Sequence, residues 1–189
     1  KRNSYRSTTA HNTICVNNEN LDEMRGRFQW KERSKSQLLL SEIRDGLQLF
    51  VLKECGYLDR FGVKIIRGVG LAEDGSIIVI DEIVGSCDKA EVNWHFHPDV
   101  SISKNLKTLS CAGNTVHFEA DSTNDFSISE EACSHSNNYL QERETKRISL
   151  RFTVKDHQRV TSFFSIDDSN AVENNKVKHE LVQLMAKGK

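Results

Sequence analysis

The sequence predicts an all-β fold: an antiparallel two-layer β-sandwich followed by a short C-terminal helix. Two observations carry this prediction. Apolar and polar residues alternate with a period of two along much of the chain, and turn signals such as Asp74-Gly75 and Ala112-Gly113-Asn114 separate the alternating stretches. A period of two is typical of strands that bury one face. Many short strands joined by tight turns favour an antiparallel sandwich over alternating strands and helices.

The clearest strand is predicted at residues 147–154, where RISLRFTV alternates without interruption. Residues 91–97 and 115–119 show the same alternation, so each of these strands should place one face on a core. The continuous apolar run Ile77–Ile80 predicts a strand that is covered on both faces. The remaining strand candidates are Thr13–Val16, Phe28–Lys31, Gln37–Leu40, Leu47–Leu52, Val63–Val69, Phe126–Ser129 and Val160–Ile166.

Only the end of the chain has a helical period. Val177, Leu181 and Leu184 recur at spacings of four and three, which gives a helix with one apolar stripe. No repeat or linker divides the rest. We therefore expect a single β-sandwich domain over residues 1–170 and a helix or tail over residues 171–189.

Charge and composition exclude several classes of function. The chain has 26 Lys and Arg against 27 Asp and Glu, so it has no general attraction to nucleic acid. No apolar run approaches the roughly 18 residues of a membrane span. The five cysteines are odd in number and widely spaced, which argues against a disulfide framework and a zinc–thiolate site. Cys15 is predicted to be a small buried thiol. Because the chain begins without Met, we expect a fragment of a longer protein.

One short motif raises the possibility of a local metal site. In HFHPD, His95 and His97 point the same way if the segment is a strand, with Asp99 next on that face. A cupin-like metalloenzyme uses such a pair, with His117 as a candidate third ligand. The glutamate and the glycine-rich lead-in of that pattern are missing, however. The alternative is a polar outer face of an ordinary strand.

Residues 5–17, YRSTTAHNTICVN, carry a more specific pattern, because a polar run brings His11 to the predicted start of a strand. The stretch resembles the R-S-T-x-x-H-N-T-hydrophobic signature of the heparinase II/III-like polysaccharide lyases. Three later stretches are similar to that family's C-terminal sandwich and keep its order: GYLDRFGVKIIRGVGL, GSIIVIDEIVG and VNWHFHPDVSI. The resemblance covers residues 1 to about 165.

The resemblance implies a chemistry, namely cleavage of uronic-acid-containing glycans by β-elimination. A base removes the proton next to the uronate carboxylate, an acid protonates the leaving oxygen, and a positioned group masks the carboxylate charge. In the family these groups come largely from a helical toroid and from H-x-H-A-D and D-x-G motifs that precede this region. None of these elements is present here. We therefore expect the chain alone to be inactive, and to supply a cleft wall and a scaffold for the toroid.

The resemblance also assigns roles to three residues. His11 matches the histidine that binds a structural zinc ion together with an upstream His and Asp, so two ligands would lie outside this chain and no cofactor is expected for the fragment. Arg6 and Asn12 are candidate substrate-binding residues that line the cleft or orient His11, with capping of the strand as the alternative. The implied partners are an acidic polysaccharide and the N-terminal toroid, and the implied location is periplasmic or secreted.

A non-catalytic carbohydrate-binding module is the main alternative function. Such a module needs exposed aromatic side chains as a platform for sugar rings, and the chain has only two Trp and three Tyr. Trp94 falls on a predicted apolar stripe and should be buried, which leaves Trp30 as the candidate. Loss of glycan binding in Trp30→Ala would favour this alternative.

Overall fold

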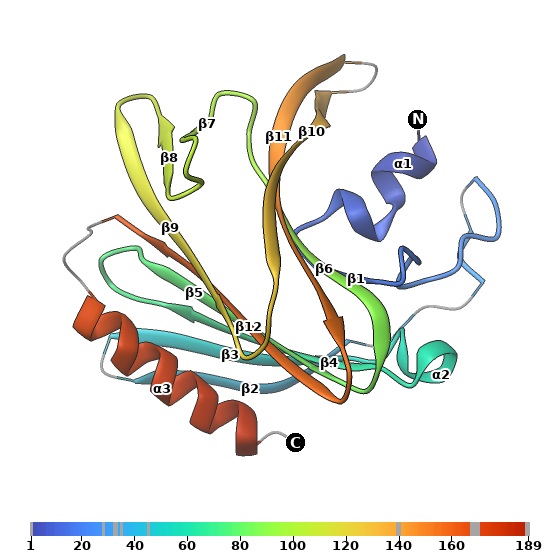
Figure 1. Cartoon of the computed structure of the whole chain (residues 1–189), viewed down its shortest axis with the longest axis horizontal. Helices are drawn as coiled ribbons and strands as arrows, with labels where there is room; N and C mark the ends of the chain where they lie inside the picture. The colour runs from blue at the N-terminus through green and yellow to red at the C-terminus, as the bar shows by residue number, and fades with distance from the viewer. Residues whose placement is uncertain are drawn as a thin grey trace.

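Two antiparallel β-sheets form the body of the protein, and a helix packs on the outside of the larger one (Figure 1). The computed structural model describes residues 2–27, 29–31, 34, 36–44, 46–138, 141–166 and 171–187. The four-stranded sheet has the order β1-β6-β11-β10, with bounds Ile14–Val16, Cys87–His95, Gln141–Val154 and Ser127–Asn138. The all-β sandwich and its C-terminal helix are thereby confirmed.

The eight-stranded sheet extends well beyond its smaller partner. Its order is β2-β3-β4-β5-β12-β9-β8-β7. In that order the strands span Gln37–Arg44, Leu47–Glu54, Lys64–Leu71, Ile77–Val84, His157–Ser165, Asn114–Ser122, Thr108–Cys111 and Ser101–Ile102. The predicted strands at 147–154 and 115–119 lie within β11 and β9, and the one predicted at 91–97 matches β6 as far as His95, where β6 ends. The short strands β7 and β8, at one end of the larger sheet, were not predicted.

The core between the sheets is built from the alternating apolar residues. Trp94 is 8 % exposed, as predicted, and its ring meets Phe164 edge to face with the centroids 5.2 Å apart. Its indole N–H donates to Ser162 Oγ on β12 at 2.9 Å. A buried indole that both packs and donates its hydrogen bond ties the two sheets together at this point.

The C-terminal helix α3 (Ala171–Lys187) covers the outer face of the larger sheet (Figure 1). The predicted stripe is buried against it, with Leu181 at 0 % exposure. Glycine on β4 makes this close approach possible, because a Cβ on Gly68 would lie 2.7 Å from Met185 Sδ. The helices α1 (Arg2–Arg6) and α2 (Leu58–Phe61) are short. Among the described residues, no helix combines the length and the apolar character needed to cross a membrane.

The N-terminal region differs from the prediction. The polar run does not lead directly into a strand, because α1 is followed by a 3₁₀ turn, η1 (Thr8–Ala10), and β1 begins at Ile14, after His11. The strand expected at Phe28–Lys31 is also wrong where it can be judged: Phe28 lies outside the described residues, and Trp30 forms only an isolated bridge with Met24. Cys15 is 2 % exposed, as predicted for a buried thiol.

Candidate functional site

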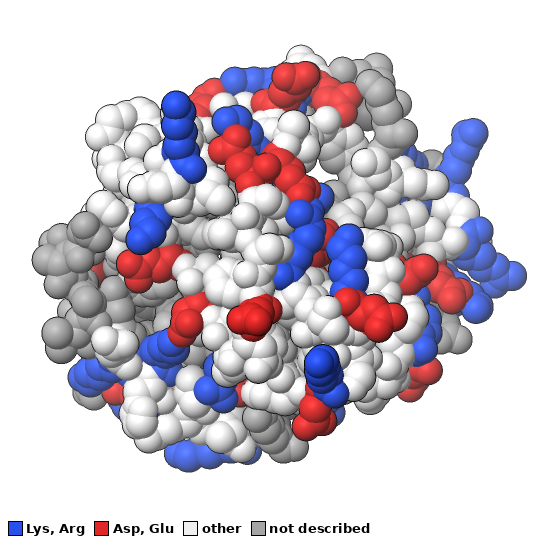
Figure 2. Space-filling model, in the orientation of Figure 1, with Lys and Arg blue, Asp and Glu red and all other residues white. Residues whose placement is uncertain are grey.

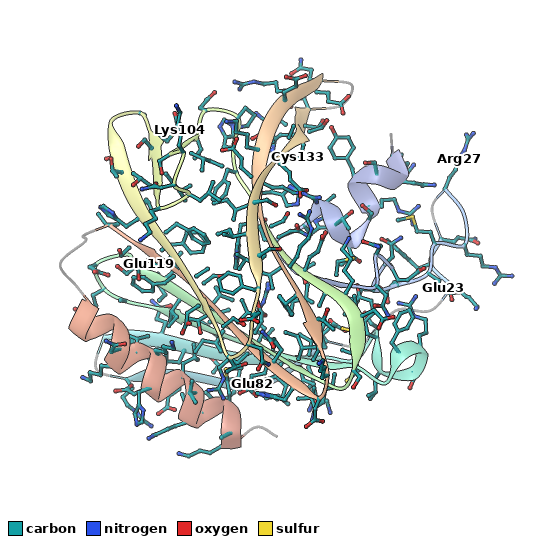
Figure 3. All side chains as sticks on the ribbon, viewed as in Figure 1. Glu23, Arg27, Glu82, Lys104, Glu119 and Cys133 are labelled. Carbon is teal, nitrogen blue, oxygen red and sulfur yellow. The ribbon has the colours of Figure 1, made fainter. Side chains whose placement is uncertain are left out.

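A layer of polar side chains covers the outer face of the four-stranded sheet, and the N-terminal residues lie on it. The hydroxyl of Tyr5 donates to Glu142 on β11 at 2.8 Å. Although they face away from the core, Asn93 and Ser149 are 0 % exposed, so the layer is itself covered. Its members are Glu91, Asn93, His95, Glu131, Cys133, Arg147, Ser149 and Arg151; Cys133 is labelled in Figure 3.

Paired charges hold this layer together. Arg151 donates to Glu91 at 3.0 Å and also to Glu131. Arg147 donates to Glu131 through Nε and Nη2 at 3.1 and 2.7 Å. Burial alone would raise the pKa of Glu131, but the hydrogen bonds from the two guanidinium groups and their charges hold that pKa below its ordinary value. The layer is therefore an ionised network. Acidic and basic groups are likewise interspersed over the face of the molecule shown in Figure 2.

The turn that carries His11 is fixed by bonds to its backbone. The amide of His11 donates to the Thr8 carbonyl at 3.2 Å, and the His11 carbonyl accepts from the Thr13 amide at 2.9 Å. Just before it, the Thr9 carbonyl accepts from the side chains of His95 and Arg147, each at 2.9 Å. His11 itself is exposed. An anchored backbone thus presents a solvent-accessible imidazole at the rim of the sandwich.

Asn12 takes part in the same anchoring through two of its oxygens. Its Oδ1 accepts from the backbone N–H of His95 at 2.7 Å, which satisfies the last amide of β6. Its carbonyl accepts from Arg67 Nη1 at 2.6 Å. The strand-capping role that the sequence left open for Asn12 is therefore present, and its predicted contact with substrate stays a prediction.

His95 is held in one tautomer by its neighbours. The Thr9 carbonyl can only accept a hydrogen bond, so Nε2 of His95 carries the proton and Nδ1 is left as an acceptor. Cys133 Sγ lies 3.6 Å from Nδ1 and donates to it. Burial, together with the nearby charges of Arg147 and His11, lowers the pKa of His95 in spite of the Thr9 carbonyl. The ring is therefore neutral at pH 7.

Arg67 and Asp81 were missed as site residues in the sequence, although both leave a signal there. Each interrupts an apolar run, KIIRGVGL in β4 and IIVIDEIV in β5. The Asp81 side chain is 1 % exposed, and Arg67 lies 5.6 Å from the Trp94 ring centroid. A buried charge needs a partner. The pair lies between the sheets, and through Arg67 it reaches the His11 turn.

Arg6 is engaged away from His11. Its Nη1 donates to the carbonyls of Gly26 and Arg27 at 2.9 and 3.0 Å. Its guanidinium carbon lies 4.4 Å from the centroid of the half-buried Trp30 ring. Arg6 thus orders the loop that follows β1 and occupies one face of the aromatic ring that a carbohydrate-binding module would need. Its predicted contact with substrate stays a prediction.

The described residues do not complete a metal centre by themselves. None of their His, Cys, Asp and Glu side chains gather in a group of three or more that could hold a metal ion. His11 offers one imidazole, which fits a zinc site only if further ligands come from elsewhere. The cupin-like arrangement is not formed either: His95 faces Thr9 and Cys133, whereas His97 lies 3.4 Å from Asp99 and its ring contacts His135. His117 lies on β9, in the other sheet.

Comparison with solved structures shows that the chain shares its fold with part of a heparinase III gene product and part of a heparan sulfate lyase. A heparinase III gene product superposes with a TM-score of 0.70 at 18 % identity, covering 87 % of this chain and 25 % of that one. The heparan sulfate lyase HepC from Pedobacter heparinus gives a TM-score of 0.70 at 20 % identity, with the same coverage. The chain thus spans about a quarter of the length of these solved relatives.

Sequence comparison agrees with the structural one. A heparin-sulfate lyase from Bacteroides stercoris is 29 % identical over 96 residues, which is 51 % of this chain and 12 % of the lyase. The model of the family described as Heparinase II/III-like, C-terminal matches residues 1–167, which include strands β1 to β12 and the His11 turn. The chain therefore belongs to the heparinase II/III-like C-terminal domain family.

Proposed function

We propose that this chain is the C-terminal domain of a polysaccharide lyase that cleaves a uronic-acid-containing glycan by β-elimination. In this proposal the domain contributes one wall of the glycan cleft, and His11 contributes one ligand to a structural zinc ion whose other ligands lie elsewhere in the protein. The observation that carries it is the exposed imidazole of His11 on a turn whose Thr9 and Asn12 carbonyls are both bound by side chains of the sandwich. Family membership supplies the chemical context.

Two guanidinium groups lie beside the backbone of the turn. Those of Arg147 and Arg67 donate to it, and each is also paired with a carboxylate, Glu131 and Asp81 respectively. Elimination next to a uronate develops negative charge, which a lyase must stabilise with positioned donors and cations. No acid or base for the proton transfers is assigned within this chain, so these groups would come from the remainder of the lyase.

The test compares two proteins on the same glycans. The 189-residue chain and a longer protein that contains it are each incubated with heparan sulfate and alginate, and ultraviolet absorbance reports the unsaturated uronate product. We expect product only from the longer protein, and His11→Ala in that protein should lower both its zinc content and its rate. Turnover by the short chain would refute the division of labour. If the longer protein is inactive on every acidic glycan, the proposed lyase function is refuted.

A further inference from the structure

Two backbone carbonyls that flank His11, those of Thr9 and Asn12, are bound by side chains from distant strands. We infer that Arg67, His95 and Arg147 form a clamp that sets the place and direction of the His11 imidazole, which makes them positioning residues of the proposed site. The inference rests on the proposed role of His11 at the cleft. Each member of the clamp lies more than 50 positions from the residue it binds, with separations of 55, 86 and 138.

The smaller sheet supplies the first half of the clamp. The Thr9 carbonyl accepts from His95 Nε2 and from Arg147 Nη1, both at 2.9 Å, so both lone pairs of that oxygen are used. Neither donor is free to leave easily. The His95 ring is fixed on its other side by Cys133, and Arg147 is held by two hydrogen bonds to Glu131.

The larger sheet supplies the second half. Arg67 extends from β4 and donates to the Asn12 carbonyl at 2.6 Å, while Nε and Nη2 donate to the two oxygens of Asp81 at 2.6 and 2.8 Å. The bidentate pair fixes the plane of the guanidinium group, and that plane determines where Nη1 points. Because the Asn12 side chain also caps β6 at His95, both sheets converge on one turn.

Little backbone freedom remains between these two anchors. Only Ala10 and His11 separate Thr9 from Asn12, and the amide and carbonyl of His11 are themselves bonded to Thr8 and Thr13. The imidazole therefore keeps only its own side-chain torsions. A ligand that is oriented before binding loses less conformational entropy when it binds, which is the physical benefit of such a clamp.

Nuclear magnetic resonance on the isotope-labelled chain tests the clamp directly. His95→Leu removes the donor to Thr9, whereas His95→Gln keeps an N–H that can reach the same carbonyl. We expect His95→Leu to speed amide exchange at His11 and Thr13 by about fivefold to tenfold, the effect of losing one such hydrogen bond. It should also shift the ring nitrogen resonances of His11, and His95→Gln should restore both.

His135→Leu is the matched control, because His135 is another half-buried histidine on the same face of the smaller sheet and does not touch the turn. It should leave the His11 ring signals unchanged. Arg67→Lys tests the half of the clamp that the larger sheet supplies. This variant keeps the positive charge opposite Asp81 but lacks the second guanidinium nitrogen, which donates to the Asn12 carbonyl. Amide exchange at Thr13 should therefore rise again.

Three results would overturn the clamp: unchanged His11 signals in both His95→Leu and Arg67→Lys, failure of His95→Gln to restore them, or equal acceleration along β6 and β11, which would indicate general destabilisation. The measurement uses neither glycan nor metal. If the longer protein shows no lyase activity, the inference about the clamp is therefore not affected. If the magnetic resonance results contradict the clamp, the outcome of the lyase assay is not affected.

Discussion

Arg67 and Asp81 form a bidentate ion pair across neighbouring strands β4 and β5, with nitrogen–oxygen distances of 2.6 and 2.8 Å. The Asp81 side chain is 1 % exposed and that of Arg67 is 20 % exposed. In a charged pair at this depth, each ion compensates the charge of the other. The pair does not by itself add stability, because both ions have lost their hydration. Its value lies in geometry, since the same guanidinium group holds the His11 turn.

The first prediction follows from the burial of this pair. Arg67→Leu leaves the Asp81 carboxylate uncompensated between the sheets, and we expect it to lower the free energy of unfolding by about 3–5 kcal/mol. The double variant Arg67→Leu/Asp81→Leu should recover a large part of that loss, because no buried charge remains. Urea unfolding of the three proteins measures both effects. If the free energy of unfolding of Arg67→Leu were within about 1 kcal/mol of the parent value, that result would contradict the burial of Asp81.

The second prediction concerns two glycines with positive φ. Gly85 has φ +118°, and a Cβ there would lie 2.4 Å from the carbonyl oxygen of Gly62. Gly113 has φ +83° but nothing within 4 Å of its Cβ position. Gly113→Ala should therefore cost about 1 kcal/mol of backbone strain, and Gly85→Ala about 2–4 kcal/mol, because a backbone clash is added. Thermal unfolding midpoints would rank the two, and equal shifts would refute the clash.

Much of the sandwich could be predicted because its signal is local. Strict alternation identified residues 147–154, which now lie inside β11, and the spacing of Val177, Leu181 and Leu184 identified the helix that buries them. The N-terminal turn has no such signal. It is held by contacts such as Arg147 with Thr9, 138 residues apart, and nothing in a polar run of Ser and Thr indicates them.

The residues of the candidate site likewise divide into those with a local sequence signal and those that only the fold brings together. His11 and Asn12 were identified through a resemblance that spans a few consecutive residues. Arg67, His95 and Arg147 reach the turn that carries His11 only when three strands come together. Arg67 and Asp81 were within reach of sequence reasoning, because a charge in an apolar run indicates a buried pair or a site. Which charge would meet which depends on strand order, and alternation alone does not determine it.

The third prediction concerns alkaline pH. Burial, and then the neighbouring charge of Glu91, raise the pKa of the Cys15 thiol from 9.0 to about 11. The folded protein therefore keeps this proton where the unfolded chain releases it, and stability should fall between pH 9 and 11, by about 1.4 kcal/mol per pH unit for this group. Burial also raises the pKa of Tyr57, which adds to the loss above pH 10.

Urea unfolding at pH 8 and at pH 10.5 measures this slope. Cys15→Ala should make the loss of stability with pH shallower, although the variant starts from a lower stability. Cys111→Ala, which removes a half-buried thiol at the end of β8, is the control and should leave the slope unchanged. If Cys15→Ala and the parent lose stability in parallel, the buried thiol is not the group responsible.

The last prediction concerns acid pH and the ionised layer. Arg147 and Arg151 hold the pKa of Glu131 below its ordinary value of 4.5. The carboxylate therefore takes up its proton at a lower pH in the folded state than in the unfolded chain. This group therefore contributes stability above pH 4.5, and the contribution is lost as the pH falls through the folded pKa. Glu131→Gln should cost about 1–2 kcal/mol at pH 7 and make the acid limb of the stability profile shallower.

Glu119→Gln provides the comparison, because Glu119 is an exposed carboxylate on β9 in the other sheet (Figure 3). It should change neither the stability at pH 7 nor the acid limb. Glu131→Gln should also loosen the Thr9 anchor, since Arg147 then loses the charge that holds it. Amide exchange at His11 would rise in this variant and not in Glu119→Gln. An acid limb identical to that of the parent would show that Glu131 is not ionised against its two arginines.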